Sequence, residues 1–100
     1  MAVNLQIRQT AEYVRWFAAL RDLRAKARID ARLRRLSLGH FGDSKLLGGG
    51  LAELRVDYGP GYRIYYVRRG DTLVVLLTGG DKSRQSADIA KARVLATELE

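Results

Sequence analysis

The sequence predicts an α+β domain with the element order β-α-α-β-β-β-β-α, a mostly antiparallel sheet and an N-terminal helical hairpin. Apolar residues alternate with polar ones near the N-terminus, recur at helical spacing between residues 10 and 38, and alternate again from residue 45. A final stretch from about residue 83 returns to helical spacing. A chain of 100 residues is expected to form one domain over 1–100, with helices on one face of the sheet and part of the other face open.

The N-terminal part is expected to form one strand and two helices. Residues 2–9 alternate as an amphipathic strand, and Thr10 has the chemistry of a helix cap. The buried side of the first helix is predicted to consist of Val14, Phe17, Ala18 and Leu20. Asp22 caps a second helix that runs to about Leu38, and Gly39 occupies the left-handed position that often follows a helix. The buried positions of this second helix are expected to be Ile29, Leu33 and Leu36.

The remaining part is expected to form four strands and a last helix. The expected strands are residues 45–47, 52–57, 62–68 and 73–77. Residues 73–77 have no polar member, which predicts a central strand covered on both faces. The glycines within 48–50, 59–61 and 79–80 are interpreted as turn residues. The last helix is expected to begin near Ser83 or Ser86 and to bury Ile89, Ala92, Ala96 and Leu99.

Charge and composition narrow the class of function. Eighteen Lys and Arg against eleven Asp and Glu give a net charge of +7. This excess predicts a polyanionic partner, nucleic acid or an acidic protein, the alternative being a soluble protein without a charged partner. With no cysteine, one histidine and no carboxylates at ligand spacing, no metal or cofactor is expected. The longest apolar run is too short to cross a bilayer and no signal-peptide pattern is present, so a cytoplasmic protein without membrane contact is expected.

Three cations on neighbouring elements form the predicted catalytic centre. Arg55 and Arg63 lie on consecutive strands, and Lys82 follows the apolar strand. An arginine fork grips two oxygens of one phosphate and stays protonated, so these groups together could hold a scissile phosphate and stabilise its transition state. The alternative for both arginines is a structural ion pair with Glu53 or Asp57 across neighbouring strands.

Aromatic and basic residues also predict an RNA-binding surface. Tyr65 alternates in phase with Arg63 and is expected to stack on an unpaired base. On the second helix, Arg32 and Arg35 either follow a phosphate backbone or form a solvated face. Lys45, at the start of the second expected strand, completes the predicted RNA-binding set.

Several segments along nearly the whole chain resemble the RelE/ParE superfamily of bacterial toxins, and within it the HigB-like addiction module killer proteins. The main ones are Gly39-His40-Phe41-Gly42-Asp43, Glu53-Leu54-Arg55, Gly59-Pro60-Gly61-Tyr62-Arg63 and Gly79-Gly80-Asp81-Lys82. The resemblance implies a RelE-like fold and a toxin of a type II toxin–antitoxin module. Such toxins cut messenger RNA, generally in the ribosomal A site, with the 2′-hydroxyl as nucleophile and without a metal. The implied partners are a cognate antitoxin, mRNA and the ribosome.

The resemblance also implies roles for single residues. Arg63 matches the family's phosphate-binding arginine, Arg55 lies on the strand that carries basic catalytic residues, and Lys82 lies close to a later catalytic arginine. Asp88 stands where RelE has a tyrosine near the start of its last helix and is counted with the catalytic set. The general base is left open between Glu53, which replaces a strand lysine, Asp88 and His40.

Two other functions remain compatible with the sequence. A ParE-like toxin would bind and inhibit DNA gyrase without nuclease activity, and a non-toxic module would bind nucleic acid through its basic helices alone. The convergence of Arg55, Arg63 and Lys82 favours an endoribonuclease, because a gyrase-binding protein does not need cations that meet at one site.

Overall fold

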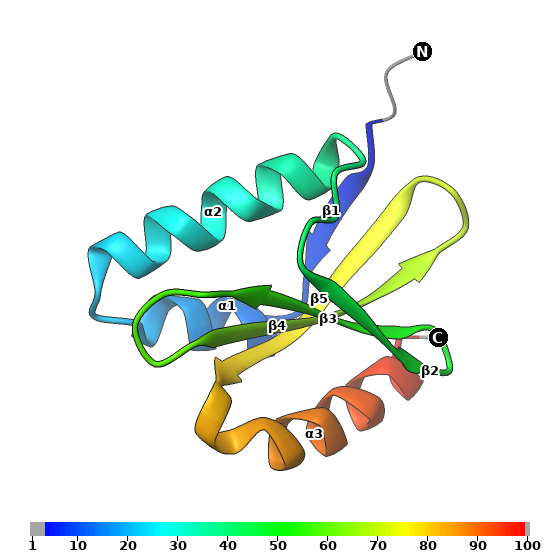
Figure 1. Ribbon diagram of the computed structural model, residues 1–100. Helices are drawn as coiled ribbons and strands as arrows, with labels where there is room; N and C mark the ends of the chain where they lie inside the picture. Colours follow the sequence, from blue (N-terminus) through cyan, green and yellow to red (C-terminus); the bar gives the residue numbers. More distant parts are fainter. Residues whose placement is uncertain (1–3, 100) are drawn as a thin grey trace.

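The computed structural model describes residues 4–99 and has the predicted element order (Figure 1). The elements are β1 (Gln6–Gln9), α1 (Ala11–Ala19), α2 (Leu23–Ser37), β2 (Ser44–Gly48), β3 (Leu51–Val56), β4 (Tyr62–Arg69), β5 (Leu73–Asp81), a 3₁₀ turn (Lys82–Arg84) and α3 (Gln85–Thr97). The predicted first strand included residues 2 and 3, which lie outside the described residues.

The sheet has five strands in the order β1-β5-β4-β3-β2. Only β1 runs parallel to its neighbour, and the other three pairings are antiparallel, which confirms the predicted fold class. The prediction that the strand at 73–77 is central was wrong, because β1 adds beside β5 and leaves β4 in the middle. The expected cover on both faces is present, since Val74 to Leu77 are all buried.

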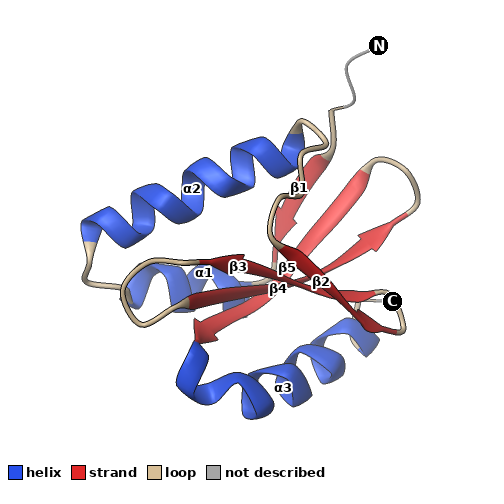
Figure 2. Ribbon diagram, in the orientation of Figure 1, coloured by secondary structure: helices blue, strands red, loops and turns tan. Residues whose placement is uncertain are grey.

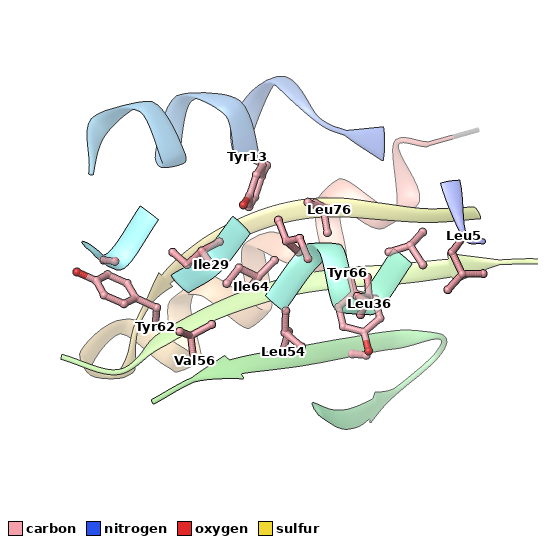
Figure 3. Close-up of a cluster of buried hydrophobic side chains, with 14 residues drawn as sticks. Leu5, Tyr13, Ile29, Leu36, Leu54, Val56, Tyr62, Ile64, Tyr66 and Leu76 are labelled. Carbon is pink, nitrogen blue, oxygen red and sulfur yellow. The ribbon is translucent and has the colours of Figure 1, made fainter. Parts of the chain in front are cut away.

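Helices cover both faces of the sheet, so the expectation of helices on one face only was wrong (Figure 2). On one face, α1 and α2 pack over a cluster that includes Tyr13, Ile29 and Leu36 (Figure 3). On the other face, α3 places Ala92 against Tyr65 and its apolar neighbours. The physical reason is that β4 and β5 carry large apolar side chains on both faces, and each face must be removed from water.

The helix caps follow the predicted chemistry. The hydroxyl of Thr10 accepts a hydrogen bond from the Tyr13 N–H at 3.0 Å, and Asp22 accepts from the first turn of α2. Gly39 has a φ of 89°, as expected after a helix. The predicted buried side of α1 was partly wrong, because Val14 is 48% exposed whereas Tyr13 is 1% exposed. Thr10 also donates to the Leu77 carbonyl, which sets the rotation of α1 on the sheet.

Two glycines interpreted as turn residues belong to strand β5. Gly79 and Gly80 are buried within it, which corrects the interpretation, whereas the glycines within 48–50 and 59–61 do have positive φ. A Cβ on Gly79 would lie 2.7 Å from Cδ2 of Trp16, and one on Gly80 would overlap Oδ2 of Asp88. The strand needs glycine at both positions so that α1 and α3 can approach it from opposite faces.

Candidate functional site

The candidate site is organised around Glu53, a strand β3 carboxylate that is fully buried. Nε of Arg55 donates to its Oε1 at 3.0 Å, and Nε of Arg63 forms an ion pair with the same oxygen at 3.7 Å. The amide of Gln85, the first residue of α3, donates to the other oxygen at 2.7 Å. Strand geometry explains the cluster, because Glu53 and Arg55 are two residues apart on one face and Arg63 is the β4 partner of Arg55.

Both arginines contact Glu53 through Nε, which leaves their outer nitrogens available to a ligand. The side chain of Arg55 is 33% exposed and that of Arg63 is 13% exposed. A Cβ on Gly61 would lie 3.9 Å from Nη1 of Arg63 and 3.6 Å from Cβ of Lys82, so the side chain of Lys82 starts at the same end of the sheet as Arg63 and its neighbour Arg55. A guanidinium held by Nε presents its two-nitrogen end as a fork that fits a phosphate.

Both alternatives that the sequence left open for Arg55 and Arg63 are present together: the two arginines pair with a carboxylate, and they also lie side by side as a cluster of cations. Glu53, and not the exposed Asp57, is the carboxylate that pairs with the arginines. The hydrogen bond from Arg55 to Glu53 raises the pKa of Arg55 further. Nε of Arg63 is buried and makes no hydrogen bond within residues 4–99. The pair therefore orients the arginines, and it neutralises only part of their charge.

Tyr65 does not face a ligand, so the prediction that it stacks on RNA was wrong. The residue is fully buried in the core on the α3 side of the sheet, and no described group hydrogen bonds to its hydroxyl. Burial raises the pKa of Tyr65 accordingly. Strand alternation correctly placed Tyr65 on the same face of β4 as Arg63, but helix α3 covers the part of that face where Tyr65 lies.

Tyr65→Phe is expected to stabilise the protein by about 1 kcal/mol, because it removes a buried hydroxyl that has no partner. Tyr66→Phe is the matched control, since the Tyr66 hydroxyl shares a 2.7 Å hydrogen bond with Ser44 and its loss should destabilise by a similar amount. Equilibrium urea unfolding of both variants tests the pair. A destabilised Tyr65→Phe protein would show that the hydroxyl has a partner after all.

Asp88 lies apart from Glu53, in the first turn of α3. It is 7% exposed, and its Oδ2 is packed against Gly80 without a hydrogen-bond donor in the described part of the chain. Burial raises the pKa of Asp88, although Arg84 and Lys91 lie near enough to oppose the effect. Since Gly80 is the β5 partner of Arg63, the carboxyl sits one strand away from the arginine cluster.

Asp88→Asn is expected to be more stable than the native protein at pH 7, with a difference that shrinks toward pH 4. The folded-state pKa of Asp88 lies above the unfolded value of about 3.9, so its stabilising contribution is complete below that value and is lost as the pH rises through the folded pKa. Asp81→Asn is the control of opposite sign. Hydrogen bonds from Ser83 lower the pKa of Asp81, so this variant should lose stability at pH 7 and approach the native protein in acid.

Urea unfolding at several pH values measures both differences. A gain from Asp88→Asn that grows on acidification would contradict the assignment of a raised pKa.

The predicted RNA-binding cations lie in different places. Lys45 is exposed on β2 and is the register partner of Glu53, so it lies on the same face as the arginine cluster. Arg32 is half-buried and donates to three backbone carbonyls, one of them that of Arg55. It therefore connects α2 to the backbone of strand β3 and does not face a ligand beside the arginine cluster. Arg35 is exposed on α2, on the other side of the sheet, beside a cleft of about 310 Å³.

Some functional candidates were not visible in the sequence. Gln85 carries no charge and no motif, so only its contact with Glu53 identifies it. Arg84, at the end of the 3₁₀ turn, and Lys91, on α3, belong to no motif of the sequence, and the structure places both in the lining of a cleft with Asp88. His40, the third general-base candidate, is exposed in the segment between α2 and β2. Among residues 4–99, no three His, Cys, Asp or Glu side chains form a group that could hold a metal ion, and no helix is long and apolar enough to cross a membrane.

Comparison with known proteins agrees with the fold. The chain is 48% identical over 97 residues to an uncharacterized protein of Haemophilus influenzae, covering 97% of this chain and 98% of that protein. The structure matches a mutant of E. coli toxin RelE in its free state with a TM-score of 0.75 over the full length of both chains, at 14% identity, which confirms the RelE fold. The model of the phage-derived Gp49-like proteins matches residues 12–99. Because that match spans most of the chain, the protein belongs to the Gp49-like family of phage-derived proteins.

Proposed function

We propose that this protein is the toxin of a type II toxin–antitoxin module and that it cleaves messenger RNA without a metal, on the ribosome, in the cytoplasm. The Gp49-like family and the RelE fold support a toxin that is held inactive by a cognate antitoxin. One observation carries the nuclease part of the proposal. Glu53 holds Arg55 and Arg63 by Nε and leaves two guanidinium forks free at one end of the sheet.

The proposed reaction needs only groups of the RNA and of this site. The 2′-oxygen attacks the adjacent phosphorus, the bond from phosphorus to the 5′-oxygen breaks, and a 2′,3′-cyclic phosphate and a 5′-hydroxyl are formed. The forks of Arg55 and Arg63, with Lys82 beside them, stabilise the extra negative charge of the transition state. The 2′-hydroxyl proton passes to a carboxylate, and the departing 5′-oxygen takes a proton from solvent.

Asp88 is the best-placed acceptor for that proton among the three candidates. Both oxygens of Glu53 are already bound, one by the arginines and the other by Gln85. Oδ2 of Asp88 accepts no hydrogen bond from the described residues, and the raised pKa of Asp88 brings it closer to the working pH, which favours general-base catalysis.

Primer extension on total RNA after a short induction tests the proposal. We expect growth arrest together with new cleavage positions in translated messages and 2′,3′-cyclic phosphate ends, because the attacking group is the 2′-hydroxyl. With purified ribosomes of verified integrity, cleavage should continue when divalent ions are chelated. Growth arrest with an SOS response and no new cleavage would instead indicate a gyrase-binding toxin, and no arrest would indicate a non-toxic nucleic-acid-binding module.

A further inference from the structure

The cleft that Arg84, Asp88 and Lys91 line lies between α1 and α3, one strand away from the arginine cluster. It has a volume of about 280 Å³, and its lining includes Trp16 from α1, Asp88 and Lys91 from α3, and the strand residues Gly79 and Gly80. Figure 1 shows the C-terminal end of β5 between the two helices. Of the residues that line the cleft, only Asp88 belongs to the site that the sequence predicted.

The cleft exists because β1 is shorter than β5. The pairing of the two strands ends at Gln9 and Leu76, and Thr10 donates to the carbonyls of Leu76 and Leu77. Beyond that point the outer edge of β5 is bordered by helix side chains, with no strand beside it in the described part of the chain. The two glycines form the floor of the cleft, and Trp16 packs on Gly79 while Asp88 packs on Gly80, so these two side chains form the walls above that floor.

The walls of the cleft combine three kinds of group that together suit a nucleotide. Trp16 is only partly buried and offers an aromatic surface for a base. Asp88 offers a carboxylate oxygen, Oδ2, that has no hydrogen-bond partner among the described residues. Arg84 and Lys91 supply positive charge for a phosphate, although the carboxylates of Glu12 and Asp81 also line the cleft. Lys91 pairs with Glu12, which joins α3 to α1 across the cleft and leaves Arg84 as the cation without a carboxylate partner among the described residues.

We propose that this cleft binds the nucleoside on the 5′ side of the cleaved phosphate, with its base against Trp16. The inference rests on the proposed nuclease function and assigns a subsite within it. Gly80 in the floor is the β5 partner of Arg63, so a nucleoside in the cleft places its ribose beside Asp88 and its 3′-phosphate toward Arg63. The arrangement brings the 2′-hydroxyl, its proton acceptor and the phosphate-binding arginine to one nucleotide.

Trp16 is the only tryptophan of the chain, so its fluorescence reports on the cleft directly. The test titrates the purified native protein with adenosine 3′-monophosphate and, as a control without a base, with ribose 5-phosphate. We expect saturable quenching by the nucleotide and none by ribose 5-phosphate at the same concentrations. No quenching by the nucleotide, or equal quenching by both ligands, would overturn the proposal. An extended peptide, which could add along the edge of β5, is titrated as a third ligand, and quenching by the peptide alone would also overturn the proposal.

Variants locate the binding site without relying on fluorescence. By calorimetry, Trp16→Ala should weaken adenosine 3′-monophosphate binding about 5- to 150-fold, the equivalent of 1–3 kcal/mol per stacked base. Because Trp16 packs on Gly79 and its loss could disturb the fold, Trp16→Phe is added and should keep most of the affinity. Lys91→Gln should weaken binding of the nucleotide, and Val14→Ala, an exposed α1 change outside the cleft, should not. Unchanged affinity in both Trp16→Ala and Lys91→Gln would reject the site.

The subsite and the nuclease function can fail separately. Arg63→Ala should still show base-dependent quenching although its cleavage is lost, because Arg63 does not line the cleft, but quenching should need a higher nucleotide concentration because the contact with the 3′-phosphate is removed. If the native protein binds the nucleotide but cuts no RNA, the proposed function fails and only nucleotide binding in the cleft stands. If it cuts RNA without base-dependent quenching, the subsite fails alone.

Discussion

Arg63→Ala is expected to lower the rate of RNA cleavage by about a hundredfold to a thousandfold and so to abolish toxicity, because it removes one preorganised donor to the transition-state phosphate. The fold should survive. Without Arg63, Glu53 keeps its hydrogen bonds from Arg55 and Gln85. The opposite face of β4, with Tyr62, Ile64 and Tyr66, still supplies the packing.

The measurement combines growth arrest, primer extension and a thermal melt of the purified variant. Arg63→Lys should not restore cleavage, because lysine keeps the charge but not the fork that holds two phosphate oxygens. Arg34→Ala removes an exposed cation of α2 on the other side of the sheet and should leave cleavage unchanged. A folded Arg63→Ala protein with full toxicity would show that Arg63 is not part of the catalytic site. A variant that melts at a lower temperature but remains toxic would show that Arg63 contributes only to stability.

Glu53→Ala is expected to cause the largest loss of stability, about 3–5 kcal/mol, because breaking a buried ion pair leaves an uncompensated charge. The side chain of Arg63 is only 13% exposed, so its guanidinium cannot regain full hydration where it lies. Such a loss is a large part of the free energy of unfolding of a domain of this size, which is typically about 5–15 kcal/mol. Cleavage should also fall, because both arginines lose the contact that orients their forks.

Urea unfolding at pH 7 measures the effect of Glu53→Ala. Glu53→Gln is the conservative control and should cost less, since an amide of the same shape still fills the site and can accept from Arg55. Glu12→Gln removes two ion pairs, with Arg15 and Lys91, between more exposed side chains and should cost at most about 1 kcal/mol for each pair. If Glu53→Ala were no more damaging than Glu12→Gln, the central position given to Glu53 would be wrong.

The sequence by itself determined the local structure of this protein. The caps at Thr10 and Asp22, the turn glycines within 48–50 and 59–61, and the change from helical to strand spacing all depend on interactions between residues close in the chain. The same short-range reasoning placed Arg55 and Arg63 on one face of neighbouring strands, because strand alternation is local. For that reason the element order and the arginine pair could be predicted before any tertiary contact was known.

The tertiary structure decided which of these positions are accessible and which share a partner. Helix α3 covers the face that carries Tyr65, and this contact buried a residue that alternation alone assigned to RNA. Gln85 contacts Glu53 across 32 residues of sequence, and Trp16 contacts Gly79 across a still longer separation. Neither contact produces a pattern among neighbouring residues from which it could be predicted. Such contacts depend on how whole elements pack against one another, and periodicity reports only the face on which a residue lies.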